Sequence, residues 1–164
     1  MFSVGEYVVY GAEGVCRVAD IEELDLTGEP LKYYVLAPES DRSSKIFVPV
    51  ENSKLTDRIS AMLTEGEIRE LLSDFSEGES VWADSTNLRK ARYHEIVNSG
   101  DRTRIIRLVR ELHARHRSIK GTGHRFSLTD EHYYKLAQKI LFDEFSRVIP
   151  VKQSDFLDLL TQKQ

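Results

Sequence analysis

The stretch Val4–Val18 constrains the fold most, because it specifies a tight reversal between two strands at the start of the chain. Its apolar runs, Tyr7–Tyr10 and Val15–Val18, are rich in the β-branched and aromatic residues that favour pleated strands. Between them Gly14 can adopt the positive φ that a tight turn requires. The pattern predicts an antiparallel hairpin, and none of its residues is a convincing catalyst.

Further strand-like runs follow at short intervals. They are Val18–Leu24, Leu31–Ala37, Lys45–Val50 and Arg58–Ser60. Pro49 cannot donate a ladder hydrogen bond, so the third of these runs is expected at a sheet edge or at a strand end. Four or five short strands within about 60 residues predict a small, strongly bent antiparallel barrel.

Helical patterns dominate the rest of the chain. Thr64 and Glu67 form a capping box, which predicts a helix that runs to about Phe75. Further helices are expected over about 85–100, 102–118, 127–148 and 156–160 from their caps and apolar spacing. The predicted fold class is α+β with two domains: a β domain at 1–61, a helix and linker at 62–81, and a helical bundle at 82–164.

The charges are distributed unevenly along the chain. Residues 1–80 contain seven Lys or Arg and seventeen Asp or Glu, whereas residues 89–125 contain eleven Lys or Arg and three Asp or Glu. These counts give nets of −10 and +8, although the whole chain has a formal charge of only −4. Such asymmetry points to two different partners, and the basic segment is expected to attract a polyanion.

Several function classes are disfavoured by composition and motifs. The single cysteine, Cys16, leaves no partner for an internal disulfide and fits a reducing cytoplasm. We expect neither a signal peptide nor a transmembrane helix. His113 and His116 share a helical face, but Arg115 and Arg117 beside them oppose a metal cation. Without a phosphate-binding loop or a catalytic motif, we expect no enzyme activity and no cofactor.

The N-terminal pattern resembles the first module of the CarD/CdnL family of bacterial transcription regulators. The residues that carry the resemblance are Phe2-x-Val4-Gly5-x-x-Val8-Val9-Tyr10-x-x-x-Gly14-Val15, then Tyr34-Val35-Leu36 and Val48-Pro49-Val50-Glu51-Asn52. The module is also similar to the RNA-polymerase-interacting domain of transcription-repair coupling factors. The resemblance implies a Tudor-like fold, a cytoplasmic and nucleoid-associated protein, and binding to the RNA polymerase β subunit.

The expected polymerase-binding residues are Leu24, Ile46, Phe47 and Val48. An exposed edge strand can pair with a partner strand, and Ile46–Val48 lies in the run predicted to form such an edge. Some family members have Arg at the positions that align with Leu24 and Phe47. With apolar residues at these positions, the contact with the polymerase would rest on buried apolar surface instead of ion pairs. Because side chains alternate along a strand, Phe47 is the exposed residue if Ile46 and Val48 point inward.

A second expected surface binds promoter DNA without reading its sequence. The predicted contacts are Trp82, Arg89, Lys90, Arg92, Arg102, Arg104 and Arg125. Basic side chains at helical spacing can follow a phosphate backbone, and no base-reading pattern accompanies them. The alternative is a solvated helix surface. Trp82 either anchors the linker or wedges between bases; the family's wedge tryptophan would align near Thr86, so the resemblance favours no wedge here.

These expectations combine into one hypothesis with an alternative. The chain is predicted to bind the polymerase β subunit through its N-terminal domain and to contact promoter DNA through its helical domain, thereby changing the stability of the open complex. The alternative is an RNA-binding or ribosome-associated adaptor, because a small β domain and a basic helical module would serve that role too.

Overall fold

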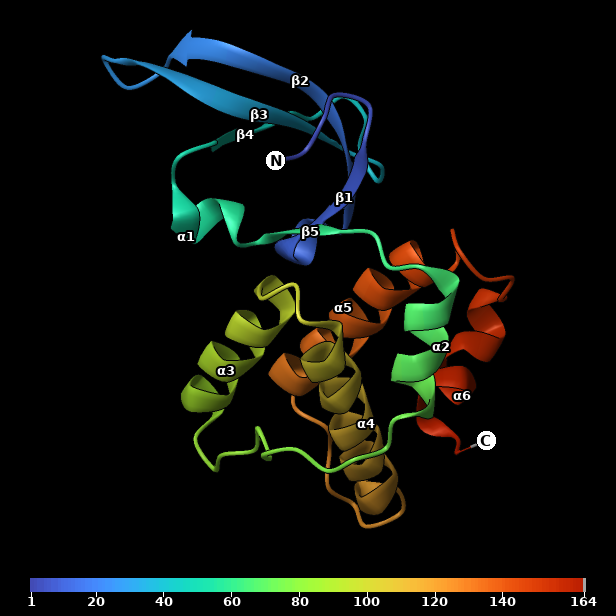
Figure 1. Cartoon of the computed structure of the whole chain (residues 1–164). Helices are drawn as coiled ribbons and strands as arrows, with labels where there is room; N and C mark the ends of the chain where they lie inside the picture. The colour runs from blue at the N-terminus through green and yellow to red at the C-terminus, as the bar shows by residue number, and fades with distance from the viewer. Residues whose placement is uncertain (164) are drawn as a thin grey trace. The chain divides into compact units, whose positions relative to one another are not determined.

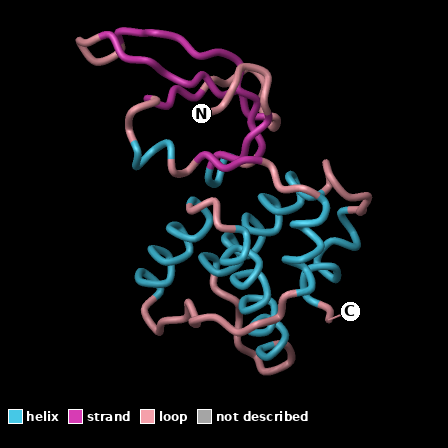
Figure 2. Tube along the Cα trace, viewed as in Figure 1, coloured by secondary structure: helices cyan, strands magenta, loops and turns pink. Residues whose placement is uncertain are grey.

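The structure is a computed structural model that describes residues 1–163, drawn in Figure 1. Contacts between residues divide the chain into two compact units, Met1–Met62 and the chain from Leu63 onward. The first unit contains all the strands of the described residues, and the second contains only helices and loops (Figure 2). The α+β class expected from the sequence is confirmed.

The N-terminal unit is a five-stranded antiparallel sheet in the order β4-β3-β2-β1-β5. The strands are β1 (Tyr7–Tyr10), β2 (Val15–Asp25), β3 (Pro30–Pro38), β4 (Ile46–Pro49) and β5 (Ile59–Ala61). The hairpin predicted around Gly14 is confirmed: β1 pairs with β2, and Gly14 has a φ of 74°. A short 3-10 helix, Gly11–Glu13, forms the turn.

The predicted barrel is not closed. β4 and β5 are the two edges of the sheet, and the described strands include no ladder between them. A short helix, α1 (Ser53–Thr56), occupies the chain between these edges. The sheet bends instead within the long β2–β3 pair, whose register shifts between Val18 and Asp20. Such a shift, typical of a β-bulge, increases twist without requiring closure.

One face of the sheet carries the core of this unit. Val8, Cys16, Val18, Leu36 and Val48 are completely buried there. Burial, followed by the nearby charges of Glu13 and Glu39, raises the pKa of the Cys16 thiol to about 12. Cys16 therefore stays a neutral packing residue at ordinary pH, as its place in an apolar strand predicts.

The second unit contains α2 (Glu65–Ser73), α3 (Thr86–Asn98), α4 (Arg102–Ile119), α5 (Leu128–Phe145) and α6 (Gln153–Thr161). Side-chain caps begin four of them: Thr64, Ser85, Asp101 and Ser127 each accept a backbone N–H three residues later. Gly100, with a φ of 73°, allows the sharp passage from α3 to α4. Two helices end earlier than predicted, α2 at Ser73 and α5 at Phe145.

The bundle core forms mainly between α4 and α5, the two longest helices. Ile105, Val109 and Leu112 of α4 and Ala137 and Leu141 of α5 are almost completely buried. They recur at the spacing of one helical face, as the sequence predicts. None of the described helices combines the length and the apolar character needed to cross a membrane.

Candidate functional site

β4 presents a free edge to solvent in the N-terminal unit. The backbone N–H of Val50 donates to the carbonyl of Lys32 at 2.9 Å, which directs this residue's polar groups toward β3. Because hydrogen-bonding directions alternate along an antiparallel strand, the backbone groups of Phe47 point away from β3. The backbone nitrogen of Pro49 also faces away from β3, so its lack of an N–H removes no hydrogen bond from the sheet. The edge position predicted from Pro49 is thus confirmed.

The side chains of β4 alternate as expected. Val48 is fully buried and Ile46 packs against the same core, whereas Phe47 is 41% exposed. Phe47 lies opposite Val35, and Leu24 lies opposite Leu31. Residues 31 and 35 of β3 point to the same side of the sheet, so Leu24 and Phe47 share the outer face.

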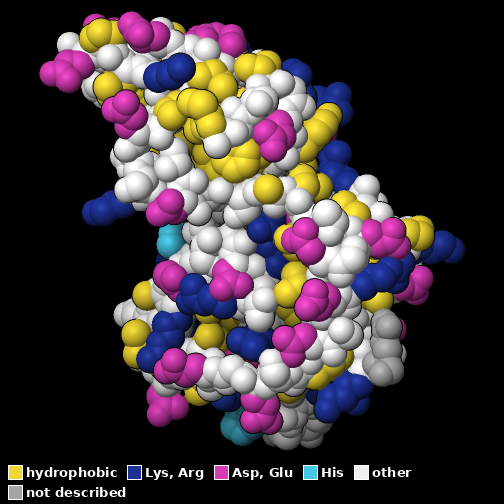
Figure 3. Space-filling model, in the orientation of Figure 1, with side chains coloured by type: hydrophobic (Ala, Val, Ile, Leu, Met, Phe, Trp, Pro, Cys, Tyr) yellow, Lys and Arg dark blue, Asp and Glu magenta, His cyan; other side chains and the backbone are white. Residues whose placement is uncertain are grey.

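The outer face is apolar beside the β4 edge. A cavity of about 660 Å³ opens there, and its lining combines Leu31, Tyr33 and Pro49 with the charged residues Glu23, Lys32 and Glu51. Hydrophobic side chains gather on the side of this unit that Figure 3 displays. A free strand edge beside an apolar surface can receive a partner strand together with its side chains.

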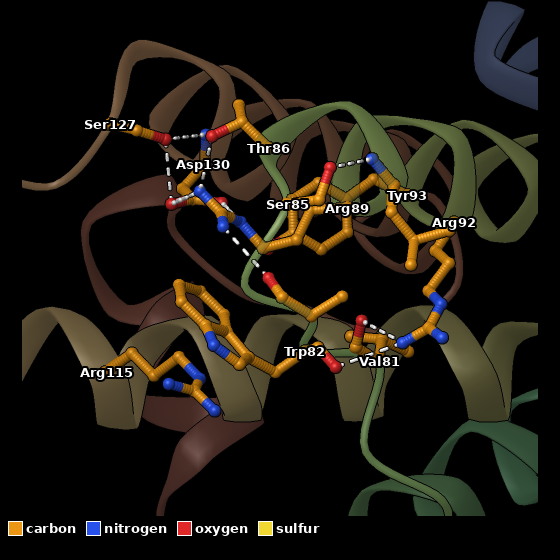
Figure 4. Close-up of polar contacts among 12 residues, drawn as sticks. Val81, Trp82, Ser85, Thr86, Arg89, Arg92, Tyr93, Arg115, Ser127 and Asp130 are labelled. Atoms are coloured by element: carbon orange, nitrogen blue, oxygen red, sulfur yellow. Dashed lines mark hydrogen bonds and ion pairs between the residues drawn. The ribbon is translucent and has the colours of Figure 1, made fainter.

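Arg89, predicted to contact DNA, lies inside the helical bundle. It is 5% exposed, and its Nε donates to Asp130 Oδ1 at 3.0 Å. Asp130 also accepts hydrogen bonds from Ser127 Oγ and, at 2.8 Å, from the hydroxyl of Tyr93 (Figure 4). Burial, and then the hydrogen bond to the Asp130 carboxylate, raises the pKa of Tyr93. Arg89 therefore joins α3 to α5 through a shared carboxylate.

Arg102 is also buried, at 8% exposed. Its Nε and Nη2 donate to the two carboxylate oxygens of Glu144, each at 2.8 Å. Glu144 also accepts the backbone N–H of Leu63 at 2.9 Å, which ties the start of this unit to α5. A bidentate pair of this kind fixes geometry strongly.

The burial of Arg89 and Arg102 argues against these two members of the predicted DNA-binding set. Their guanidinium groups pair with internal carboxylates and are therefore not accessible to the phosphates of DNA. The sequence could not reveal this, because the partners Asp130 and Glu144 lie about 40 residues away in a different helix. A count of basic residues does not separate solvent-exposed arginines from buried ones.

Trp82 is held between two arginines. The guanidinium carbon of Arg89 lies 4.2 Å from the ring centroid, and that of Arg115 lies 3.6 Å from it. Figure 4 shows the indole reaching toward both groups from the segment that precedes α3. The Trp82 carbonyl accepts from Arg92 Nη1 at 3.0 Å. This placement supports the anchoring alternative, because a wedge would have to leave both cation–π contacts.

The other predicted basic residues differ in their availability. Arg104 pairs with Glu95 on the surface, and Arg92 donates to the carbonyls of Val81 and Trp82. Lys90 and Arg125 are exposed. On the side of the helical unit that Figure 3 displays, Lys and Arg are interspersed with Asp and Glu.

Three basic residues gather where α4 ends and the next loop begins. Arg117, Lys120 and Arg125 are exposed, and within residues 1–163 none of them has an ion-pair or side-chain hydrogen-bond partner. We call these three residues the basic end of α4. They provide a surface for phosphate groups, and this surface does not depend on the buried Arg89 and Arg102.

The histidine pair is part of an aromatic cluster. His113 Nδ1 lies 2.8 Å from the hydroxyl of Tyr134, and the His116 ring stacks on the Tyr134 ring. Burial, followed by the charges of Arg117 and His116, lowers the pKa of His113. The described residues contain no group of three or more metal-type ligands.

Comparison with known proteins finds a family model that is similar to the N-terminal unit. Residues 2–61 match the family model of the CarD-like/TRCF RID domain. The N-terminal unit is therefore similar to this family of domains. The resemblance seen in the sequence is confirmed over this segment, which coincides closely with the sheet. No curated protein matches the chain.

The CarD-like/TRCF RID domain is an RNA-polymerase-interacting domain, which supports a role related to transcription. Its match ends at residue 61, so it does not extend to the helical unit with α2 to α6. The free β4 edge and the apolar outer face lie within the matched residues.

Proposed function

We propose that the chain is a transcription regulator that binds the RNA polymerase β subunit through β4 and contacts promoter DNA through its helical unit. The single observation that carries the proposal is the RNA-polymerase-interacting domain, whose edge strand offers unpaired backbone groups and an exposed Phe47. Backbone pairing supplies affinity in such a contact, and the apolar side chains supply specificity.

The DNA contact follows from the basic end of α4, with Lys90 as a further contributor. A sequence-independent contact with few phosphates is weak alone. Once the polymerase holds the protein beside the promoter, the effective concentration of DNA makes the same contact useful. If the contact is stronger in the open complex than in the closed complex, it shifts the equilibrium toward the open one.

The polymerase contact is tested with the full chain and an immobilised polymerase β-subunit fragment. We expect Phe47→Asp to weaken binding at least about tenfold, because it places a charge at the centre of an apolar contact. Leu128→Asp is the matched control, since Leu128 is 85% exposed and lies in the other unit. Equal binding by both variants would exclude β4 as the contact.

The nucleic-acid contact is tested with duplex DNA and structured RNA of equal length at several salt concentrations. Replacing Arg117, Lys120 and Arg125 by Gln should lower DNA affinity and flatten its salt dependence, with polymerase binding unchanged. A strong preference for RNA would instead favour the adaptor role. The effect on transcription is measured as the lifetime of promoter open complexes with the wild type and with Phe47→Asp.

A further inference from the structure

An acidic segment without helix or strand connects α2 to α3. This linker, Asp74–Ser85, contains four carboxylates and no Lys or Arg. In Figure 1 it runs from the end of α2 across α4 to the start of α3. α3 and α4 belong to the basic part of the chain, so the linker brings acidic groups to a basic surface.

Residues of α3 and α4 hold the linker in place: Glu111 accepts from Ser80 and Val81, and three arginines donate to linker oxygens. Arg110 Nη1 donates to the carbonyl of Asp74 at 2.7 Å, and Arg107 Nη2 donates to Ser76 Oγ at 3.1 Å. Arg92 binds the carbonyl of Trp82 farther along. A Cβ atom at Gly78 would lie only 2.9 Å from Arg107 Nη1, so the linker backbone lies directly against this guanidinium. We call Arg92, Arg107 and Arg110 the covered arginines.

Two linker carboxylates face these same arginines. Hydrogen bonds from Ser76, and then the charges of Arg107 and Arg110, lower the pKa of Asp74. Glu79 shares a cavity of about 350 Å³ with Arg92, Arg104 and Arg107. The linker thus supplies both hydrogen-bond acceptors and negative charge to groups that bind phosphate well.

We propose that the linker is a displaceable cover that competes with a DNA phosphate backbone for the covered arginines. The inference rests on the proposed DNA contact and adds its regulation. When the linker is in place, DNA reaches only the exposed basic residues. When the linker leaves, Arg92 on α3 and Arg107 on α4 become available, and Arg110 is freed only from Asp74, since it still donates to the carbonyls of Leu72 and Leu160.

The acceptors on the linker explain why a phosphate can replace it. The covered arginines donate to neutral carbonyl and hydroxyl oxygens. Arginine binds an anionic phosphate more strongly, and often through two parallel hydrogen bonds. The linker also contributes no strand or helix, so its departure breaks no backbone ladder. The carboxylates of the linker repel an approaching phosphate until the linker is displaced.

The test is the affinity of the full chain for a labelled duplex DNA at several salt concentrations. We expect Asp74→Asn with Glu79→Gln to bind about fivefold or more tightly than the wild type and to show a steeper salt dependence, because additional phosphates are neutralised. Both substitutions preserve side-chain size and hydrogen-bonding oxygen. Adding Arg107→Gln to this pair should remove most of the gain.

The matched control is Glu29→Gln with Glu51→Gln, which removes two exposed carboxylates from the N-terminal unit. If the linker pair binds DNA no better than this control while the wild type still binds, the cover is refuted and the proposed function stands. If none of these proteins binds DNA, the proposed DNA contact fails and the cover fails with it. The same proteins are also titrated with polyglutamate. If the linker pair gains as much affinity for polyglutamate as for DNA, competition with phosphate is overturned, because such a result would indicate an acidic protein partner.

A second measurement follows the linker directly. Displacement should accelerate hydrogen exchange of amides in residues 74–85 when saturating DNA is added. Unchanged or slower exchange in the linker would contradict displacement.

Discussion

Individual arginines in this chain perform opposite roles although the sequence presents them alike. Arg102 and Arg104 are two positions apart at the start of α4. The first is buried against Glu144, and the second pairs with Glu95 at the surface. Because desolvation makes a lone buried charge very costly, the same substitution at the two positions should have different effects.

Arg102→Met should lower the free energy of unfolding by about 3–5 kcal/mol, because it leaves the Glu144 carboxylate buried without its cation. Arg104→Met should lower it by less than about 1 kcal/mol, since a surface pair is screened by solvent. Urea unfolding followed by circular dichroism measures both values. Equal losses would show that the Arg102–Glu144 pair is not the buried tie described above.

At the scale of elements, local sequence signals placed the helices well. Thr64, Ser85, Asp101 and Ser127 mark helix starts because a cap requires only neighbours three residues away. The same argument failed for barrel closure. Pairing between β4 and β5 is a long-range property, and no local pattern reports it.

Two glycines test the local backbone argument. Gly100→Ala should lower the free energy of unfolding by about 1–2 kcal/mol, because its φ of 73° suits only glycine well. Gly66→Ala should raise it by about 0.5 kcal/mol, since Gly66 lies within α2 and a Cβ there meets no atom within 4 Å. Thermal unfolding of both variants compares the signs. Unchanged or higher stability of Gly100→Ala would refute the assigned role of the φ at position 100, and destabilisation by Gly66→Ala would contradict the prediction for α2.

At the scale of the molecule, the sequence predicted the change from strands to helices near residue 61, because the period of the apolar residues changes there. The edge strand β4 was equally predictable, since Pro49 and the alternation of its side chains are local signals. The exposure of the basic residues was harder to predict. Burial of an arginine depends on a carboxylate from a distant helix, as with Arg89 and Asp130.

The two units should fold separately. Each has its own buried residues, so residues 1–62 and 63–164 expressed alone should each unfold cooperatively. The sum of their circular dichroism spectra should equal that of the full chain. A fragment from residue 63 onward that lacks helical signal would contradict this expectation.

Asp130 has a consequence for how this protein can change over evolutionary time. Its carboxylate is the shared acceptor of Arg89 and Tyr93, and it accepts from Ser127 at the start of its own helix. Loss of the acid alone would leave a guanidinium and a phenol without their acceptor inside the bundle. Positions 89, 93 and 130 are therefore constrained to drift together, and a lineage that gives up the acid must also replace the arginine.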